Sequence, residues 1–179
     1  MSVGRIAVRY ATPIIELAEE KKVLDDVKGD MEAFISVCEE NRDFALMLKS
    51  PIIPHQKKAD ILKKVFSGKV NELTLQAFDI ITRKNREKFL ENIAEEFLNL
   101  YNIKKGLAEV SVTTSFELDA DMKKAFEKLA KEITGKEPIL KGKIDSEIVG
   151  GYILKVGDRQ IDESVSGQLK DLKLKFSKK

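Results

Sequence analysis

The sequence predicts a mainly α protein, in which an N-terminal helical bundle is followed by a small α+β C-terminal domain. Apolar residues recur at helical spacing from the start of the chain to about residue 106. At Leu107 the spacing changes to the alternation that is typical of strands. Hydrophobic residues make up 42% of the 179 residues and charged residues 35%, which indicates a globular protein with a charged surface. We therefore expect two domains, 1–106 and 107–179, with the boundary at Gly106.

The first domain begins with two helices before residue 41. Each has one apolar face, formed by Ala7, Ala11, Ile14 and Ala18 in the first helix and by Val27, Met31, Phe34 and Cys38 in the second. The prolines in residues 50–54 interrupt the helical pattern, because proline disfavours a helical residue before it. Pro54 fits the first turn of a further helix, which should end at Ser67-Gly68.

The remaining helices of this domain differ in their apolar faces. Residues 73–81 carry apolar side chains nearly all round a helix, which predicts a central position. Residues 90–101 carry a single apolar stripe, and their helix should end at Lys104, Lys105 and Gly106, where basic side chains and a glycine favour a C-terminus. The residues alone predict five or six helices.

The second domain should contain several strands and two helices. Residues 107–112, 140–144 and 152–156 alternate as strands do, and Gly157-Asp158 has the composition of a hairpin turn before Gln160 and Ile161. Asp119 can cap a helix that ends at Gly135. A last helix carries an apolar stripe, formed by Val165, Leu169, Leu172 and Phe176.

The sequence offers little that could perform chemistry. It has one histidine, His55, and one cysteine, Cys38, so the usual zinc sites and nucleophile–base pairs lack their residues. Gly150-Gly151 is followed by a predicted strand and lacks the lysine and serine of a phosphate-binding loop. Asp162 lies near other acidic residues, but their spacing favours turn and capping roles over metal binding. We expect no catalytic residue, metal or cofactor.

Charge and hydropathy narrow the classes of partner. The net charge is only +2, which does not favour a generic nucleic-acid binder. No stretch of 18 apolar residues occurs, so we expect no membrane span. The terminal helix is basic and amphipathic, which leaves open a helical partner, an acidic membrane surface or RNA. A stand-alone RNA-binding factor would need an aromatic stacking surface beside this helix.

Residues 143–158 and 161–169 contain a double glycine at 150–151 at a fixed spacing from the segment from Asp162 to Val165. In these residues, and above all in this spacing, the second half of the chain resembles the signature of the delta family of the F-type ATP synthase, which includes the mitochondrial oligomycin-sensitivity-conferring protein. Residues 7–11 are similar to the opening helix of the family, and Ser50-Pro51 with the residues that follow matches its middle. Asn85 and Glu163 stand where the family usually has glycine.

The resemblance implies a six-helix N-terminal bundle that grips the N-terminal helix of an alpha subunit between its first and fifth helices. It also implies that the C-terminal domain holds the b subunits of the peripheral stalk. The chain would then be a non-catalytic connector, monomeric when isolated, and held at the cytoplasmic face of a bacterial membrane only through the complex.

Three sets of residues follow as candidate sites. The alpha-binding groove is expected at Tyr10, Ala11, Ile14, Leu75, Phe78 and Thr82. Stalk binding is expected at Val165, Leu169, Leu172 and Phe176, and a structural turn at Gly150, Gly151, Gly157 and Asp162. The alternative for the first set is that its members pack against one another inside the bundle.

Overall fold

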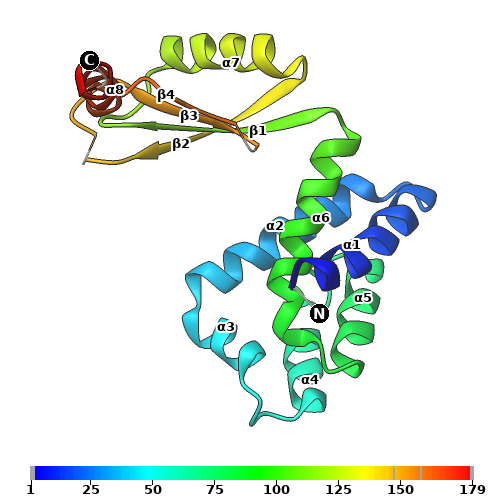
Figure 1. Cartoon of the computed structure of the whole chain (residues 1–179). Coiled ribbons are helices and arrows are strands. Elements are labelled where there is room, and N and C mark those ends of the chain that lie inside the picture. Colours follow the sequence, from blue (N-terminus) through cyan, green and yellow to red (C-terminus); the bar gives the residue numbers. More distant parts are fainter. Residues whose placement is uncertain (1–2, 147, 158, 178–179) are drawn as a thin grey trace. The chain divides into compact units, whose positions relative to one another are not determined.

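The computed structural model describes residues 3–146, 148–157 and 159–177; in the last helix it leaves the side chains of Asp171, Leu172, Leu174, Lys175 and Ser177 undescribed. The chain forms two compact units, Met1–Tyr101 and Asn102–Lys179 (Figure 1). The mainly α class with a small α+β part is confirmed. Gly106, the boundary expected from the sequence, lies a few residues after this division and directly before the first strand.

The N-terminal unit is helical throughout its described residues. Its elements are α1 (Val3–Glu20), α2 (Leu24–Glu40), α3 (Arg42–Lys49), α4 (His55–Phe66), α5 (Glu72–Arg83), the short 3-10 helix η1 (Glu87–Phe89) and α6 (Leu90–Lys104). Helix α3 is the one that periodicity does not identify. Asn41 is its N-cap, and the side-chain oxygen of Asn41 accepts a hydrogen bond from the backbone N–H of Phe44 at 3.1 Å.

Aromatic rings fill the centre of this unit. Phe34 of α2 lies 4.9 Å from Phe78 of α5 and 5.6 Å from Phe66 of α4, measured between ring centroids. Phe44 of α3 joins the group through Phe34 and Phe66. Rings at these separations add roughly 0.5–1.5 kcal/mol per pair beyond the burial of their surface. One cluster therefore ties four helices together.

The C-terminal unit contains a four-stranded sheet in the order β2-β1-β3-β4. Its elements are β1 (Leu107–Thr114), α7 (Ala120–Thr134), β2 (Glu137–Ile144), β3 (Tyr152–Val156), β4 (Arg159–Asp162) and α8 (Val165–Ser177). Strands β1 and β2 are parallel and joined through α7, whereas β1–β3 and β3–β4 are antiparallel. The expected hairpin at Gly157 is confirmed by the pairing of Val156 with Arg159, while Asp158 lies outside the described residues.

Helix α7 covers one face of the sheet. The core beneath it consists of Val110, Val112, Leu118, Ala130 and Leu154, with Phe126, Leu129, Ile133, Leu140, Tyr152 and Val156 packed against them. The strand residues of this core come from β1, β2 and β3 and lie at alternate positions, as the strand period of two predicts, and none of them comes from β4.

Candidate functional site

The six residues expected to line the alpha-binding groove do not share one surface. Ala11 and Thr82 are fully enclosed, and Ile14 and Phe78 are exposed by 7% and 3%, so these four lie inside the bundle. Leu75 is half-buried and, together with Phe78, lines a cavity of about 390 Å³ between α4 and α5. Of the six, only Tyr10 and Leu75 have appreciable exposed surface.

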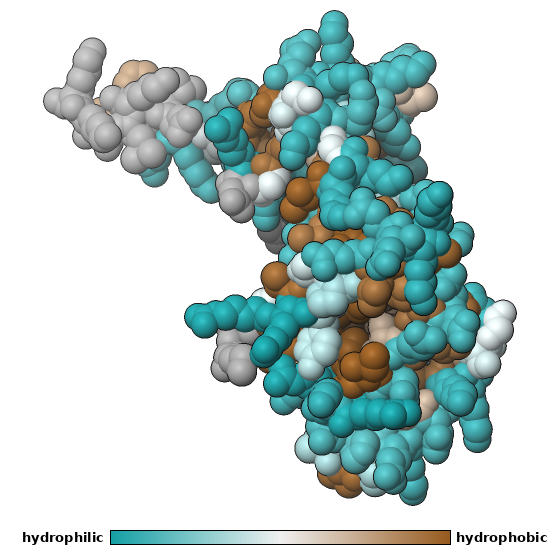
Figure 2. Space-filling view, turned by 90° about the vertical axis from the view of Figure 1, so that its right-hand side faces the viewer, coloured by the Kyte–Doolittle hydropathy of each residue, from teal (hydrophilic) through white to brown (hydrophobic). Residues whose placement is uncertain are grey.

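Other apolar side chains of α1 and α5 are exposed. Leu17 is exposed by 47%. Tyr10 precedes it by seven residues and therefore lies on the same edge of α1, with the exposed Pro13 between them. On α5, Ile80 is exposed by 54%, so this helix is not as enclosed as its composition suggests. Figure 2 views the side of the molecule on which α1 and α5 lie in Figure 1, and hydrophobic residues gather near the middle of this face of the N-terminal unit.

The turn after α5 reaches back to α1. Asn85 has φ +55°, a left-handed conformation that asparagine tolerates, so the absence of the usual glycine is physically reasonable. Arg86 then places its guanidinium carbon 5.8 Å from the centre of the Tyr10 ring, which is within the range of a cation–π contact. This contact brings the end of α5 beside the edge of α1 that carries Tyr10.

A buried lysine of α4 forms an ion pair with Glu87, directly after the turn that contains Asn85 and Arg86. The sequence did not identify this lysine. Lys58 of α4 is exposed by only 2%, and its ammonium group donates to Glu87 Oε1 at 2.8 Å and to the carbonyl oxygens of Leu48 and Ser50 at 2.9 and 2.6 Å. The Lys58 ammonium group therefore satisfies carbonyl oxygens at the C-terminal end of α3 and also binds the side chain of Glu87 in η1. A lysine on a helix is usually at the surface, so no sequence signal distinguishes this one from its neighbour Lys57.

In the C-terminal unit, three of the four residues expected to form a structural turn, Gly150, Gly151 and Asp162, lie where the start of β3 approaches the start of α8, whereas Gly157 lies in the hairpin between β3 and β4. A Cβ atom built on Gly151 would lie 2.2 Å from the carbonyl oxygen of Glu163, and Gly151 also has φ +83°, so only glycine fits there. The backbone N–H of Val165 donates to the carbonyl oxygen of Gly150 at 3.0 Å. The spacing between the double glycine and the segment beginning at Asp162 therefore reflects a direct backbone approach.

Asp162 organises the start of α8. Its Oδ1 accepts hydrogen bonds from the backbone N–H of Ser164 at 3.0 Å and from the Ser164 hydroxyl at 2.5 Å. These hydrogen bonds hold the pKa of the Asp162 carboxyl below its usual value, because they favour the charged form. Ser164 Oγ in turn accepts from the backbone N–H of Gly167 at 3.0 Å, as an N-terminal cap does.

The residues expected to bind the stalk form an uncovered stripe on α8. Val165, Leu169 and Phe176 are exposed by 44%, 61% and 76%. Their spacing of four and seven residues puts them on one side of the helix. The side chain of Leu172, the fourth member expected from the sequence, lies outside the described residues.

The described residues hold no group of three or more His, Cys, Asp and Glu side chains that could bind a metal ion. Cys38 is buried, and burial raises the pKa of its thiol to about 11. Among the described residues, no helix has the length and hydropathy needed to cross a membrane. The rings of Phe126 and Tyr152 pack together under α7, with centroids 4.9 Å apart, rather than forming the stacking surface that an RNA-binding sheet would need.

Comparison with known proteins identifies the family. Residues 6–176 match the model of the family described as ATP synthase delta (OSCP) subunit. An ATP synthase subunit delta from Cytophaga hutchinsonii is 38% identical over 177 residues, covering 99% of this chain and 97% of that protein. The subunit delta of Amoebophilus asiaticus is 34% identical over 174 residues, covering 97% and 95%.

A solved structure supports the fold. A chain in the cryo-EM structure of the Toxoplasma gondii mitochondrial ATP synthase hexamer aligns with a TM-score of 0.78 and 22% identity, covering 98% of this chain and 97% of that one. At this identity the likeness concerns the fold alone. Since the family model and the relatives both extend over nearly the whole sequence, the chain belongs to the ATP synthase delta (OSCP) subunit family.

Proposed function

We propose that this chain is a non-catalytic connector of the F-type ATP synthase, which joins the N-terminal helices of alpha subunits to the b subunits of the peripheral stalk. Residues 1–106 would dock on the catalytic head, and residues 107–179 would hold the stalk. The rotor exerts torque on the head, and only a head held from outside can convert that torque into the conformational changes of ATP synthesis. The chain transmits force and performs no reaction itself.

The uncovered stripe of α8 is the observation that carries this proposal. Val165, Leu169 and Phe176 are all exposed on one side of a helix whose other exposed residues include Lys170 and Lys173. A helix of an isolated domain normally turns such a stripe toward its own core. An amphipathic helix with its apolar side uncovered fits a helical partner, and the b subunits supply one.

On the N-terminal unit, the surface that supports alpha docking consists of Tyr10, Pro13 and Leu17 on α1 and Ile80 on α5. This set keeps Tyr10 from the six residues expected from the sequence but not Ala11, Ile14, Phe78 and Thr82, because those four side chains are buried in the core. A helix laid on this surface would cover apolar side chains from both α1 and α5 while leaving the core intact.

The proposal places the chain at the cytoplasmic face of a bacterial membrane, held there by the rest of the complex. The isolated protein is a monomer, since each docking surface awaits a different subunit rather than a second copy of the chain. It needs no cofactor.

The alpha-binding half is tested by titrating a labelled synthetic peptide of the alpha N-terminal segment with the wild type, Leu17→Asp, Ile80→Asp and Leu46→Asp. Leu46 is exposed by 53% on α3, so its variant is a matched control away from the docking surface. A charge at the centre of an apolar interface costs at least about 2 kcal/mol, or roughly thirtyfold in affinity. We expect this loss of affinity for Leu17→Asp and Ile80→Asp but not for Leu46→Asp. Equal binding by all four proteins would show that the alpha peptide does not dock on this surface.

The stalk-binding half is tested with a soluble fragment of the b subunit. Leu169→Asp should weaken its binding at least tenfold, whereas Met122→Asp, at an exposed methionine of α7, should leave it unchanged. If Leu169→Asp binds the fragment as the wild type does, α8 is not the stalk site. Melting temperatures measured in parallel separate loss of binding from loss of fold.

A further inference from the structure

Exposed apolar side chains gather at one end of the sheet in the C-terminal unit, outside the core beneath α7. Phe116, Ile144 and Val149 are exposed by 50%, 60% and 84%. Phe116 follows the end of β1, Ile144 is the last residue of β2, and Val149 precedes β3. We call these three residues the end patch. A single exposed apolar residue is ordinary, whereas a contiguous group of them indicates an interaction surface.

The strand register brings the members of the end patch together. Thr114, the last residue of β1, pairs with Ile144 of β2 on one side and with Tyr152 of β3 on the other. Neighbouring strands are about 4.8 Å apart, so these three strand ends lie within roughly 10 Å of one another across the sheet. The backbone N–H of Asp145 donates to the carbonyl oxygen of Thr114 at 2.9 Å. This hydrogen bond holds the start of the loop between β2 and β3 at the end of β1.

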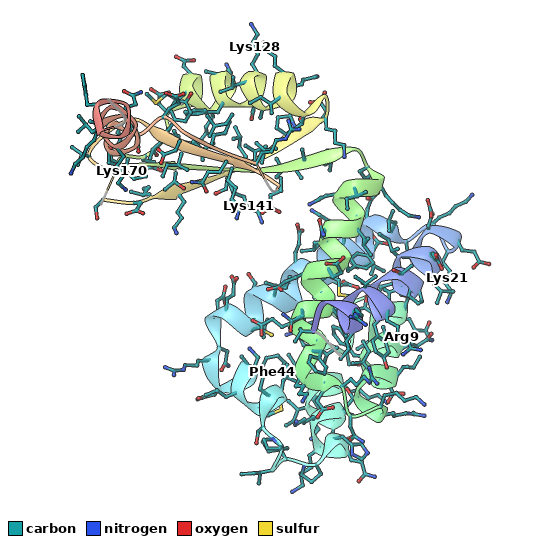
Figure 3. All side chains as sticks on the ribbon, in the orientation of Figure 1. Arg9, Lys21, Phe44, Lys128, Lys141 and Lys170 are labelled. Carbon is teal, nitrogen blue, oxygen red and sulfur yellow. The ribbon has the colours of Figure 1, made fainter. Side chains whose placement is uncertain are left out.

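The end patch continues into the stripe of α8. Val165 is the first residue of that stripe, and its backbone N–H donates to the carbonyl oxygen of Gly150 at 3.0 Å. A Cβ atom built on Gly150, the residue after Val149, would lie 3.4 Å from Val165 Cγ2. In Figure 1, α8 lies beside the end of the sheet at which β1 and β2 finish. Figure 3 shows Lys170 of α8 at this end, and Lys141 nearer the middle of the sheet.

The stripe alone is small for a stable complex. Val165, Leu169 and Phe176 together expose on the order of 300 Å² of apolar surface, whereas each partner in a stable complex buries about 800 Å². The end patch adds roughly another 300 Å² directly beside it. The sheet is about 14 Å wide from β2 to β4, and a helix of about ten residues, roughly 15 Å long, spans that width.

We propose that the end patch is a second contact of the peripheral stalk, so that the helical end of the b subunits covers the stripe of α8 and continues over Phe116, Ile144 and Val149. This inference rests on the proposed binding of the stalk by α8 and extends it to a different part of the unit. Continuity with the stripe identifies the occupant, because a helix that covers Val165 comes within reach of Val149. Aliphatic side chains of that helix would pack against the end patch and bury it.

The test measures binding of the soluble b fragment to the full chain by fluorescence anisotropy. Val149→Asp and Phe116→Asp each place a charge in the end patch. The matched control is Ile52→Asp, at a residue of the N-terminal unit that is exposed by 88%. We expect at least tenfold weaker binding for both patch variants and less than twofold change for the control. Melting temperatures are measured in parallel, and if Val149→Asp melts early, Val149→Ser replaces it.

Photo-crosslinking tests whether the contact is direct. A benzophenone maleimide attached to the new thiol of Val149→Cys should link the chain to the b fragment, whereas the same label on Ile52→Cys should not. Cys38, the natural cysteine, is buried, so the label attaches to the introduced thiol.

The outcomes separate this inference from the proposed stalk site. Wild-type affinity of both patch variants, or no crosslink from position 149, together with weakened binding by Leu169→Asp, would overturn the end patch and leave the α8 site standing. Weakened binding by the patch variants without an effect of Leu169→Asp would support the end patch and refute the α8 site. Equal weakening by Ile52→Asp would show a response to charge alone and overturn the inference. No binding of the b fragment to the wild type would overturn both.

Discussion

Replacing Lys58 with methionine should destabilise the N-terminal unit more than the same substitution at its exposed neighbour Lys57. The substitution leaves Glu87, exposed by 8%, without its cation, and leaves the carbonyl oxygens of Leu48 and Ser50 without their donor. Removing one partner of a buried ion pair typically costs about 3–5 kcal/mol. Because a domain of this size loses about 4–8 °C of melting temperature per kcal/mol, Lys58→Met should lower it by at least 12 °C or so.

A double-mutant cycle separates the ion pair from the rest of the effect. Glu87→Leu alone leaves the buried ammonium group without its carboxylate, whereas Lys58→Met/Glu87→Leu leaves no uncompensated charge. We therefore expect the double variant to be more stable than the sum of the single changes predicts, by roughly 2 kcal/mol or more. Urea unfolding followed by circular dichroism measures all four proteins, with Lys57→Met as the control. Additive effects, or a cost below about 1 kcal/mol for Lys58→Met, would refute the account of this pair.

Two further predictions concern the turn at Gly151 in the C-terminal unit and the hydrogen bond between Tyr101 and Asp25 in the N-terminal unit. Gly151→Ala should destabilise the C-terminal unit by more than about 2 kcal/mol, because the new Cβ would lie 2.2 Å from the Glu163 carbonyl oxygen. Gly4→Ala should not destabilise this unit, because a Cβ at Gly4 has nothing within 4 Å. Amide exchange of β3 measures the difference between the two variants. Tyr101 donates a hydrogen bond to Asp25 Oδ1 at 2.7 Å, and this bond raises the pKa of Tyr101 to about 12. The folded state therefore holds the Tyr101 proton more tightly than the unfolded chain does, so the free energy of unfolding should fall between pH 10 and 12. It should fall less steeply in Tyr101→Phe. If the free energy of unfolding falls equally with pH in both proteins, the hydrogen bond of Tyr101 is not the cause.

The sequence predicts most of the elements because most helices carry one long apolar stripe. It does not predict α3, whose eight residues offer only Phe44 and Leu48 as buried positions, too few to establish a helical period. The strands of the C-terminal unit are predicted by the alternation of apolar and polar residues, and the turn at Gly151 is predicted by the spacing of its motif. The sequence does not predict that β1 and β2 pair in parallel or that α7 covers one face of the sheet; the structure shows both.

The candidate sites were less predictable for a physical reason. A helix that is apolar nearly all round, such as α5, does not reveal from its sequence which side faces the core, and the structure turns Phe78 inward and Ile80 outward. The stripe of α8 is visible in the sequence, but its lack of cover is not, since the same pattern describes a helix packed on its own domain. Burial of Lys58 depends on two carbonyl groups and a carboxylate that meet only in the folded chain.

The central claim is that one chain holds two partners at once through separate units. It is tested most directly by immobilising the alpha N-terminal peptide, capturing the full chain on it, and then adding the soluble b fragment, with each step followed by biolayer interferometry. The account predicts that the b fragment adds to the captured chain without displacing it, that Ile80→Asp weakens the first step roughly thirtyfold, and that Leu169→Asp weakens only the second step, at least tenfold. Displacement of the chain by the b fragment, or loss of both steps in Leu169→Asp with the fold intact, would contradict it.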